Sequence, residues 1–196
     1  IMTITTNKTS LEQIKKFFDK NDWKPLPFQI ESWDAYLNGE NGIIQVPTGC
    51  GKTYAALMGP LSKLNYCRKK SGLNILLITP LKALSRDLKN AINSAAKHFH
   101  EEITVGIRNG DTSPYEKKKQ ILNPPNILIT TPESLSLLLS NKESKNIFKN
   151  LFSIIIDEWH ELMGSKRGNQ CELCLSWLRG NKKDLQIWAM SATIGN

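Results

Sequence analysis

The stretch Gly42–Thr53, which reads GIIQVPTGCGKT, decides the fold. Its first residues are mostly apolar and have the length of a short strand. Gly49 and Gly51 then permit the sharp backbone turns that point N–H groups at a phosphate. A helical pattern begins at Lys52, and a helix that starts beside the loop adds its positive N-terminal dipole. Strand, glycine-rich loop and helix in this order predict a phosphate-binding loop.

The residue types within this loop suggest the individual contacts. Gly51, Lys52 and Thr53 complete the pattern G-x-x-x-x-G-K-[ST], although Val46 stands where the first glycine is expected. Lys52 can reach the β- and γ-phosphates of a nucleotide, and the Thr53 hydroxyl can ligate Mg²⁺. A glycine-rich turn without a ligand is the alternative, which the flanking strand and helix disfavour. The predicted nucleotide-binding residues of the loop are Thr48, Gly49, Cys50, Gly51, Lys52 and Thr53.

Strands and helices alternate along the rest of the chain. Apolar runs with the length of strands lie at 42–46, 74–79, 103–107, 126–130, 152–157 and 185–190. Helical patterns lie at 11–18, with Ser10 as a cap, and at 29–37, 52–64, 82–97, 132–139 and 170–178. Apolar runs without alternation are typical of strands covered on both faces. We therefore expect an α/β fold with a mostly parallel sheet and helices on both faces, residues 1–40 forming N-terminal helices and residues 41–196 the α/β unit.

The composition excludes several classes of protein. The 196 residues are 40% hydrophobic and 22% charged, which is typical of a soluble globular domain. Four cysteines are too few for a disulfide scaffold, and no apolar run is long enough to span a bilayer. The first 20 residues are polar and rich in lysine, unlike a secretory signal. The net charge of +8 weakly favours a polyanionic partner, so we expect a cytoplasmic, nucleoid-associated protein without a membrane contact.

An acidic pair, Asp157-Glu158, directly follows the apolar run that ends at Ile156. In open α/β sheets, ligands bind at the C-terminal ends of the strands, where the phosphate loop also lies. Asp157 is then placed to hold Mg²⁺, and Glu158 to deprotonate an attacking water. A solvated acidic loop is the alternative, and the phosphate loop upstream makes the catalytic interpretation preferable. The pair predicts Mg²⁺-dependent hydrolysis of a nucleotide.

Two cysteines show only part of a metal-binding pattern. Cys171 and Cys174 have the spacing of half a zinc knuckle, but no second pair with such spacing exists in the sequence. Both lie on one face of a predicted helix, where cysteine packs like a small hydrophobic residue. We therefore expect them in the core and assign no zinc site.

Taken together, the motifs resemble the first RecA-like domain of a superfamily-2 DExH-box helicase. The resemblance covers nearly the whole chain and has the family's order of motifs. PFQ at 27–29 looks like the Q motif, VPTGCGKT at 46–53 like motif I, and TPLKAL at 79–84 like motif Ia. TTPESL at 130–135 looks like motif Ib, DEWH at 157–160 like motif II, and SAT at 191–193 like motif III. Val46 replaces the small residue that is usual at that point of motif I.

A narrower likeness is carried by three longer segments. They are DEWHELMGSKRGNQCEL at 157–173, IWAMSATIGN at 187–196 and RNGDTS at 108–113. These segments are similar to the large-helicase-related (Lhr) family and, within it, to the ligase-associated DExH-box DNA helicases.

The resemblance implies roles for residues outside the phosphate loop. Gln29 looks like the glutamine that reads adenine, with a helix-surface glutamine as the alternative. Phe28 or Trp23 is implied to stack on the base, although both are equally suited to the core. His160, Ser191 and Thr193 are implied to couple the nucleotide site to the nucleic-acid site. The implied catalytic residues are Lys52, Asp157, Glu158 and His160, and the implied Mg²⁺ ligands are Thr53 and Asp157. The implied nucleic-acid contacts are Pro80, Lys82, Arg108, Asp111, Thr131, Ser134, Lys166 and Arg167.

The function implied by the resemblance is an ATP- and Mg²⁺-dependent motor that moves 3′-to-5′ on single-stranded DNA in DNA repair. A DNA ligase or nuclease system is the implied partner. Nothing in this chain matches motifs IV to VI, so the second RecA-like domain and its arginine finger are expected from the parent protein. The alternatives are an RNA helicase, a translocase subunit of a restriction or remodelling complex, and a binding module with a degenerate ATP site. Intact Lys52, Thr53, Asp157 and Glu158 argue against the last of these.

Overall fold

A single parallel sheet of six strands organises the chain. The computed structural model describes residues 2–66, 71–80 and 85–192. The strand order is β1-β6-β5-β2-β4-β3, and every neighbouring pair is parallel. Each strand overlaps a predicted one, so the expected α/β fold with its parallel sheet is confirmed. The strands are β1 (Gly42–Gln45), β2 (Ile75–Ile78), β3 (Val105–Arg108), β4 (Ile127–Thr130), β5 (Ser153–Ile156) and β6 (Gln186–Ser191).

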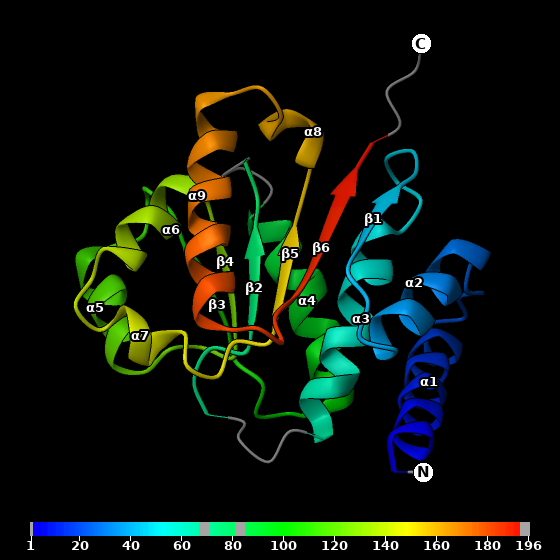
Figure 1. Cartoon of the computed structure of the whole chain (residues 1–196). Helices are drawn as coiled ribbons and strands as arrows, with labels where there is room; N and C mark the ends of the chain where they lie inside the picture. Colours follow the sequence, from blue (N-terminus) through cyan, green and yellow to red (C-terminus); the bar gives the residue numbers. More distant parts are fainter. Residues whose placement is uncertain (1, 67–70, 81–84, 193–196) are drawn as a thin grey trace.

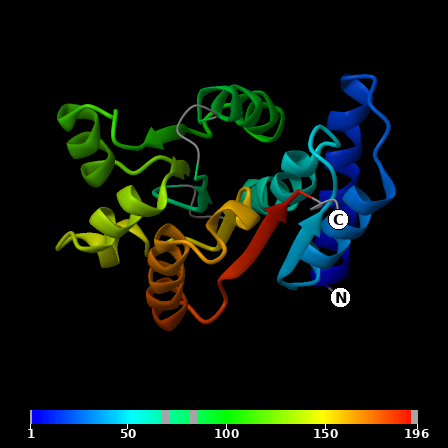
Figure 2. The same cartoon turned by 90° about the horizontal axis from the view of Figure 1, so that it is seen from above.

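Helices cover both faces of the sheet, as Figure 1 and the view from above in Figure 2 show. On one face lie α3 and α4, and α1 and α2 pack against α3 within the same apolar cluster. On the other face lie α6, α7 and α9, which share a second apolar cluster. The helices are α1 (Met2–Lys20), α2 (Pro27–Leu37), α3 (Lys52–Tyr66), α4 (Ser85–Phe99), α5 (Pro114–Leu122), α6 (Pro132–Leu139), α7 (Ser144–Ile147), α8 (Trp159–Leu162) and α9 (Lys166–Asn181).

Strand β2 shows why the apolar runs lack polar alternation. Side chains alternate between the two faces of a sheet along a strand. Ile75 and Leu77 belong to the cluster under α3 and α4, whereas Leu76 and Ile78 belong to the cluster under α6 and α9. All four are fully buried, because helices cover both faces. Such burial is the largest favourable contribution to the folding of a domain of this kind.

Several helices differ from the prediction. The first helix begins at Met2, so the expectation that Ser10 caps it is wrong; Ser10 lies inside α1 and is buried. Helix α9 begins four residues earlier than expected, and α5, α7 and α8 are not among the predicted helices. The start of α5 has a recognisable physical cause, since the Ser113 hydroxyl accepts a hydrogen bond from the Glu116 N–H at 3.2 Å and Pro114 occupies the first turn.

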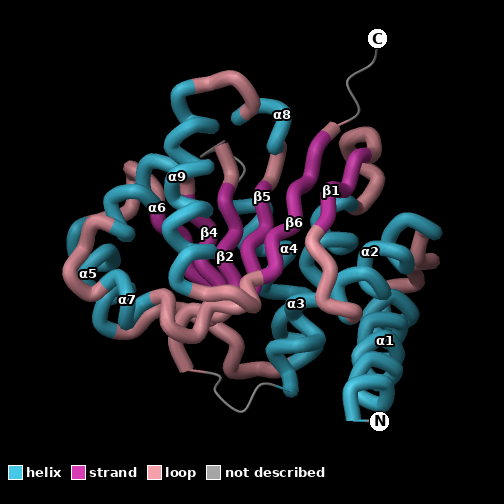
Figure 3. The backbone as a smooth tube through the Cα atoms, in the orientation of Figure 1, coloured by secondary structure: helices cyan, strands magenta, loops and turns pink. Residues whose placement is uncertain are grey.

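The parallel arrangement brings the C-terminal ends of all six strands to one edge of the sheet. The arrows of β1, β2, β5 and β6 in Figure 1 point the same way, and Figure 3 shows pink loop segments at the upper ends of β1 and β5. The predicted phosphate loop follows β1, and the predicted catalytic pair follows β5. Ligands of open parallel sheets bind at this edge. Among the described residues, no helix is long and apolar enough to cross a membrane.

Candidate nucleotide site and nucleic-acid surface

The loop between β1 and α3 has a backbone that glycine alone adopts easily. Gly49 and Gly51 have φ angles of +83° and +80°. Gly51 is also held by a neighbour, because the side-chain amide of Gln29 donates to its carbonyl at 3.1 Å. A Cβ atom at position 51 would lie 2.7 Å from that amide nitrogen. Position 51 therefore requires glycine both for its conformation and for the close approach of Gln29.

The ammonium group of Lys52 is buried beside the acidic pair. The Lys52 side chain is 7% exposed, and its Nζ atom has no hydrogen-bond partner among the described residues. An unpaired ammonium group is costly to bury, so this site favours a bound anion such as a terminal phosphate. The group faces a cavity of about 340 Å³ that combines the phosphate loop with the acidic pair. The cavity is lined by Thr48, Gly49, Gly51, Lys52, Thr53, Tyr54, Leu88, Ala91, Asp157 and Glu158.

Asp157 is placed in this cavity by the end of β5. Its N–H donates to the Ile78 carbonyl at 2.8 Å, and its Oδ1 accepts from the Glu158 N–H at 3.0 Å. Burial, reinforced by the negative charge of Glu158, raises the pKa of Asp157 to about 6 from its usual 3.8, although Lys52 opposes the shift. A carboxylate whose charge is disfavoured in this way is stabilised by a divalent cation.

The donor set fits magnesium in particular. No group of three or more His, Cys, Asp or Glu side chains that could hold a metal occurs among the described residues. Mg²⁺ commonly uses only one or two protein ligands, with water and substrate phosphates completing the shell. Thr53 and Asp157, which line the same cavity, supply oxygen ligands of this kind.

One carboxylate oxygen of Glu158, Oε2, is buried and has no hydrogen-bond donor in the part of the chain that the structure describes. Its backbone is in the left-handed region, with φ +46° and ψ +48°. The Oε2 atom lies 3.3 Å from Nδ1 of His160, yet the same nitrogen is 3.3 Å from the Ala192 N–H. A ring nitrogen that accepts the amide proton carries no proton of its own and cannot also donate to Glu158. In that tautomer the buried Oε2 atom of Glu158 receives no proton from His160.

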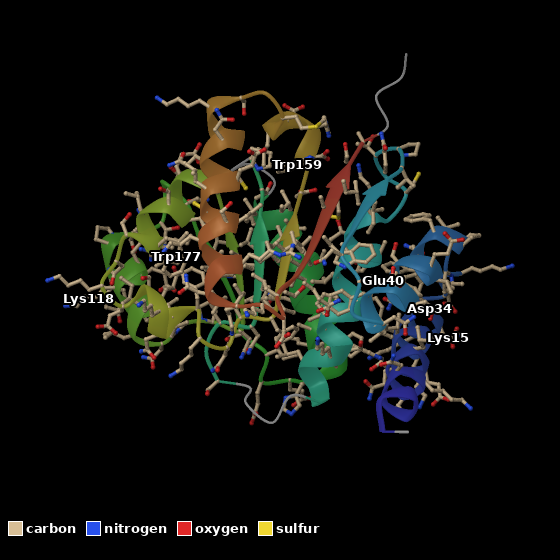
Figure 4. The ribbon with its side chains drawn as sticks, in the orientation of Figure 1. Lys15, Asp34, Glu40, Lys118, Trp159 and Trp177 are labelled. Carbon is tan, nitrogen blue, oxygen red and sulfur yellow. The ribbon has the colours of Figure 1, made fainter. Side chains whose placement is uncertain are left out.

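His160 connects the acidic loop to the end of β6. Its Nδ1 lies 3.3 Å from the Ser191 hydroxyl as well as from the Ala192 amide. The structure thus brings together His160 and Ser191, two of the predicted coupling residues. Thr193 lies outside the described residues. Trp159, labelled in Figure 4, stands at the start of α8 between the acidic pair and this histidine.

The other predicted nucleotide contacts have different surroundings. Gln29 is 3% exposed, and its Oε1 accepts from the Leu26 N–H at 2.9 Å. With its contact to the phosphate loop this leaves one N–H and one lone pair of the amide for other partners. Trp23 is 43% exposed and packs on Tyr54 with ring centroids 5.2 Å apart, whereas Phe28 packs on the core. Cys50 is partly exposed and is not among the residues that line the cavity.

A second cavity lies at the same edge of the sheet, beyond β4. Its volume is about 410 Å³, and it collects four of the predicted nucleic-acid contacts. Its lining residues are Arg108, Gly110, Lys117, Thr131, Glu133, Ser134, Leu137 and Arg167. Pro80 is tied to this group through its carbonyl, which accepts from Arg167.

The predicted contacts differ in how free their side chains are. Arg108 is 8% exposed and donates to the Lys117 carbonyl at 2.9 Å, and burial lowers its pKa. Thr131 caps α6, because its hydroxyl accepts from the Ser134 N–H at 3.4 Å. Asp111 and Lys166 are exposed and do not line the cavity. Lys82 lies outside the described residues. Figure 4 shows Lys118 of α5 pointing away from the molecule, in line with its omission from the predicted contacts.

Comparison with known proteins assigns the chain to a family. The model of the DEAD/DEAH box helicases matches residues 26–196, which is most of the chain. The chain belongs to the DEAD/DEAH box helicase family. The predicted helicase domain, with its ATP-binding and nucleic-acid-binding character, is therefore confirmed.

Within this family the chain is similar to Lhr helicases. It is 39% identical over 166 residues to the ATP-dependent helicase Lhr-Core of Sulfolobus acidocaldarius, which covers 80% of this chain and 19% of that protein. It is 37% identical over 166 residues to the Lhr helicase/probable uracil glycosylase of Mycolicibacterium smegmatis, covering 79% of this chain and 11% of the relative. The helicase domain thus spans less than a quarter of these relatives, and the narrower ligase-associated branch stays a prediction.

Solved structures agree with this placement. The structure of Mycobacterium smegmatis helicase Lhr bound to ssDNA and AMP-PNP superposes with a TM-score of 0.84 at 33% identity, covering 93% of this chain and 24% of that one. The DEAD-box helicase Mss116 bound to ssRNA and UDP-BeF superposes with a TM-score of 0.82 at 20% identity, which shows the shared fold alone. The RecA-like fold expected from the sequence is confirmed.

Some residues at the two cavities were not predicted from the sequence. Tyr54, Leu88 and Ala91 line the nucleotide cavity, and Glu133 lies beside Arg167 at the second cavity. Tyr54 directly follows the phosphate loop, so its position beside the nucleotide cavity could have been predicted from the sequence. Leu88 and Ala91 come from α4, and only the packing of α4 beside α3 brings them there.

Proposed function

We propose that this domain is the ATP-binding half of a motor that hydrolyses ATP and moves 3′-to-5′ on single-stranded DNA. The observation that carries the proposal is the buried, unpaired ammonium of Lys52 in one cavity with Asp157 and Glu158. Such a cavity needs a polyphosphate to balance Lys52 and a divalent cation to balance the carboxylates.

Each residue of the cavity has a role in this proposal. Lys52 and the backbone N–H groups of the loop hold the β- and γ-phosphates, and Thr53 and Asp157 hold Mg²⁺. The bound metal supplies positive charge to the phosphate oxygens. Glu158 orients the attacking water and accepts its proton at the oxygen that no donor occupies. Gln29 recognises the adenine while it fixes Gly51.

The same site suggests how the reaction is coupled to movement. His160 contacts Glu158 of the acidic pair on one side and Ser191 at the end of β6 on the other, so a change at the phosphates can be transmitted to β6. The segments after β3 and β4 lie at the same edge and offer hydroxyls, backbone N–H groups and cations to a nucleic-acid backbone. A second RecA-like domain of the parent protein completes the motor.

The setting of the motor is a further part of the proposal. We propose single-stranded DNA as the track, a repair process with a DNA ligase or nuclease as the setting, and the nucleoid of the cytoplasm as the location. The Lhr structure that superposes on this chain is bound to ssDNA, which supports DNA as the track. An RNA helicase and a translocase subunit of a restriction or remodelling complex are the competing functions.

ATP hydrolysis by the full-length protein tests the proposal. Turnover is measured at fixed low salt without nucleic acid, with single-stranded DNA and with single-stranded RNA, and Lys52→Ala is the control. We expect stimulation by DNA that is lost in the variant. Stimulation by RNA alone would show that RNA, and not DNA, is the track. ATP turnover that survives Lys52→Ala would refute the assignment of this site.

Polarity is tested separately by strand displacement. The substrates are duplexes that carry a single-stranded tail on either the 3′ or the 5′ end of the loading strand. We expect unwinding from the 3′ tail only. Stimulated hydrolysis without displacement from either tail would favour the translocase subunit.

A further inference from the structure

We propose that Arg167 is a positioning residue of the nucleic-acid surface and not a phosphate ligand. The inference rests on the proposed function, because it concerns the surface along which the nucleic acid runs. The guanidinium of Arg167 joins three segments that are distant in sequence. Its Nε and Nη2 atoms donate to the two carboxylate oxygens of Glu133, and Nη2 also donates to the Pro80 carbonyl at 2.8 Å.

The segments joined by Arg167 carry the predicted nucleic-acid contacts. Pro80 begins the loop after β2, and Glu133 lies in the first turn of α6. Thr131, two residues before Glu133, caps the same helix through the N–H of Ser134. Arg167 therefore ties Pro80, just after β2, to the start of α6.

The start of α9 holds Arg167 in place. The Ser165 hydroxyl accepts from the Gly168 N–H at 3.0 Å and caps the helix. Gly168 packs so closely that a Cβ atom there would lie 2.0 Å from the Leu162 carbonyl oxygen. The backbone of Arg167 is therefore fixed between this cap and this contact, and the hydrogen bonds to Glu133 and Pro80 orient its side chain.

Charge balance also argues against a phosphate contact for Arg167. Burial alone raises the pKa of Glu133, but hydrogen bonds, first of all from Arg167, more than reverse this shift and keep the carboxylate charged. The guanidinium of Arg167 is thus already paired with the Glu133 carboxylate in a bidentate arrangement that lysine cannot reproduce. Lys166, its neighbour, is exposed and makes no such pair among the described residues, so it is the cation free to meet a phosphate.

The two interpretations predict opposite effects for Glu133→Ala. A phosphate ligand held back by Glu133 would be released, and a negative charge beside a polyanion would vanish, so DNA binding would tighten. A positioning residue would lose its anchor, so DNA binding would weaken. The measured quantities in the full-length protein are the DNA concentration that half-maximally stimulates ATP hydrolysis and the rate without DNA. Glu172→Ala, which removes an exposed carboxylate elsewhere on α9, is the matched control.

We expect Glu133→Ala and Arg167→Ala each to raise the half-maximal DNA concentration about fivefold to tenfold, with the double variant no worse than either single variant. Arg167→Lys should fail to restore wild-type binding, and Glu172→Ala should match wild type. Tighter binding by Glu133→Ala, additive effects, or full function of Arg167→Lys would each overturn the inference.

The failure of the inference and the failure of the proposed function are distinguishable. The wild-type protein alone decides whether DNA stimulates hydrolysis. Binding of a fluorescent oligothymidylate, followed by anisotropy on the same variants, reports on Arg167 without any need for turnover. Its dependence on salt adds a second criterion, because loss of a true phosphate contact lowers the slope of log affinity against log salt by about 0.7 on a single strand. We expect that decrease for Lys166→Gln and not for Arg167→Gln.

Discussion

Glu158 combines a strained backbone with a buried carboxylate oxygen to which no group among the described residues donates. A non-glycine residue in the left-handed region costs about 1 kcal/mol, and such strain is found where function fixes a conformation. The strain turns the side chain toward His160 and the nucleotide cavity, instead of leaving it in the extended path of the strand. This geometry suits a base that must stand beside the terminal phosphate without a competing hydrogen bond.

We predict that Glu158→Gln separates binding from turnover. The amide keeps the shape of the side chain but cannot take a proton, so hydrolysis should fall by about 10²- to 10⁴-fold. The phosphate contacts of Lys52 remain, and binding of a fluorescent ATP analogue should be close to wild type. Lys52→Ala, the matched variant, should lose both properties. Undiminished hydrolysis by Glu158→Gln would show that another group is the base.

Asp157 should make the nucleotide-free protein less stable. The pKa of Asp157 is about 6 in the folded protein and near 3.8 when unfolded, so the folded state binds the proton more tightly. Stability from this group is complete below pH 4 and is lost as the pH rises through 6. Asp157→Asn removes the buried charge, and we expect it to be more stable by about 1 to 3 kcal/mol at pH 8.

The pH dependence distinguishes this effect from a general gain in packing. The difference in unfolding free energy between Asp157→Asn and wild type, measured by urea titration, should shrink between pH 6 and pH 4. A difference that is constant with pH, or a variant that is less stable at pH 8, would contradict the prediction. Loss of Mg²⁺-dependent nucleotide binding in the same variant would connect this cost to function.

At the scale of elements, the start of α9 depends on one glycine. We predict that Gly168→Ala destabilises the domain by about 2 kcal/mol or more, because the added methyl group would meet the Leu162 carbonyl. Gly180 lies near the other end of the same helix, with open space where a Cβ would stand. Gly180→Ala is the matched control and should stabilise by about 0.5 to 1 kcal/mol. Thermal unfolding of both variants measures whether each is less or more stable than wild type. Equal changes in stability for Gly168→Ala and Gly180→Ala would contradict the argument.

The helices and strands that were predictable are those whose signal is local. Six apolar runs predicted six strands, because burial on both faces leaves a pattern that neighbouring residues carry by themselves. Helix α6 has the predicted bounds, since Thr131 and Pro132 mark its start. Helix α5 was missed although Ser113 and Pro114 give the same kind of signal, because its lysine run, residues 117–119, interrupts any apolar spacing. The early part of α1 was missed as well; there the Asn7 side chain donates to the Leu37 carbonyl of α2 at 3.1 Å, a contact that no local pattern shows.

At the scale of the whole molecule, the topology turns separate motifs into one site. The phosphate loop and the acidic pair were predicted to meet because parallel strands end at one edge, and the structure places both in one cavity. The pairing of Arg167 with Glu133 was not predictable, since the two residues are 34 positions apart and no periodicity links them. The positions of site residues were predictable where the residue directly follows a strand. They were not predictable where a contact forms between the side chains of two different helices.

The nucleotide cavity also predicts how this chain behaves alone. Among the described residues that line it, Lys52 is the sole cation, whereas the transition state of phosphoryl transfer spreads charge over several oxygens. A further arginine, supplied by a second domain, adds about 10³- to 10⁵-fold to the rate in motors of this chemistry. We therefore expect the polypeptide of residues 1–196 to bind ATP weakly and to hydrolyse it at least about 10³-fold more slowly than the DNA-stimulated full-length protein. Steady-state hydrolysis by both proteins measures the ratio, with Glu158→Gln of the shorter chain as the background and thermal unfolding as proof that it is folded. A folded chain that turns over ATP at the full-length rate would show that the cavity needs no second domain.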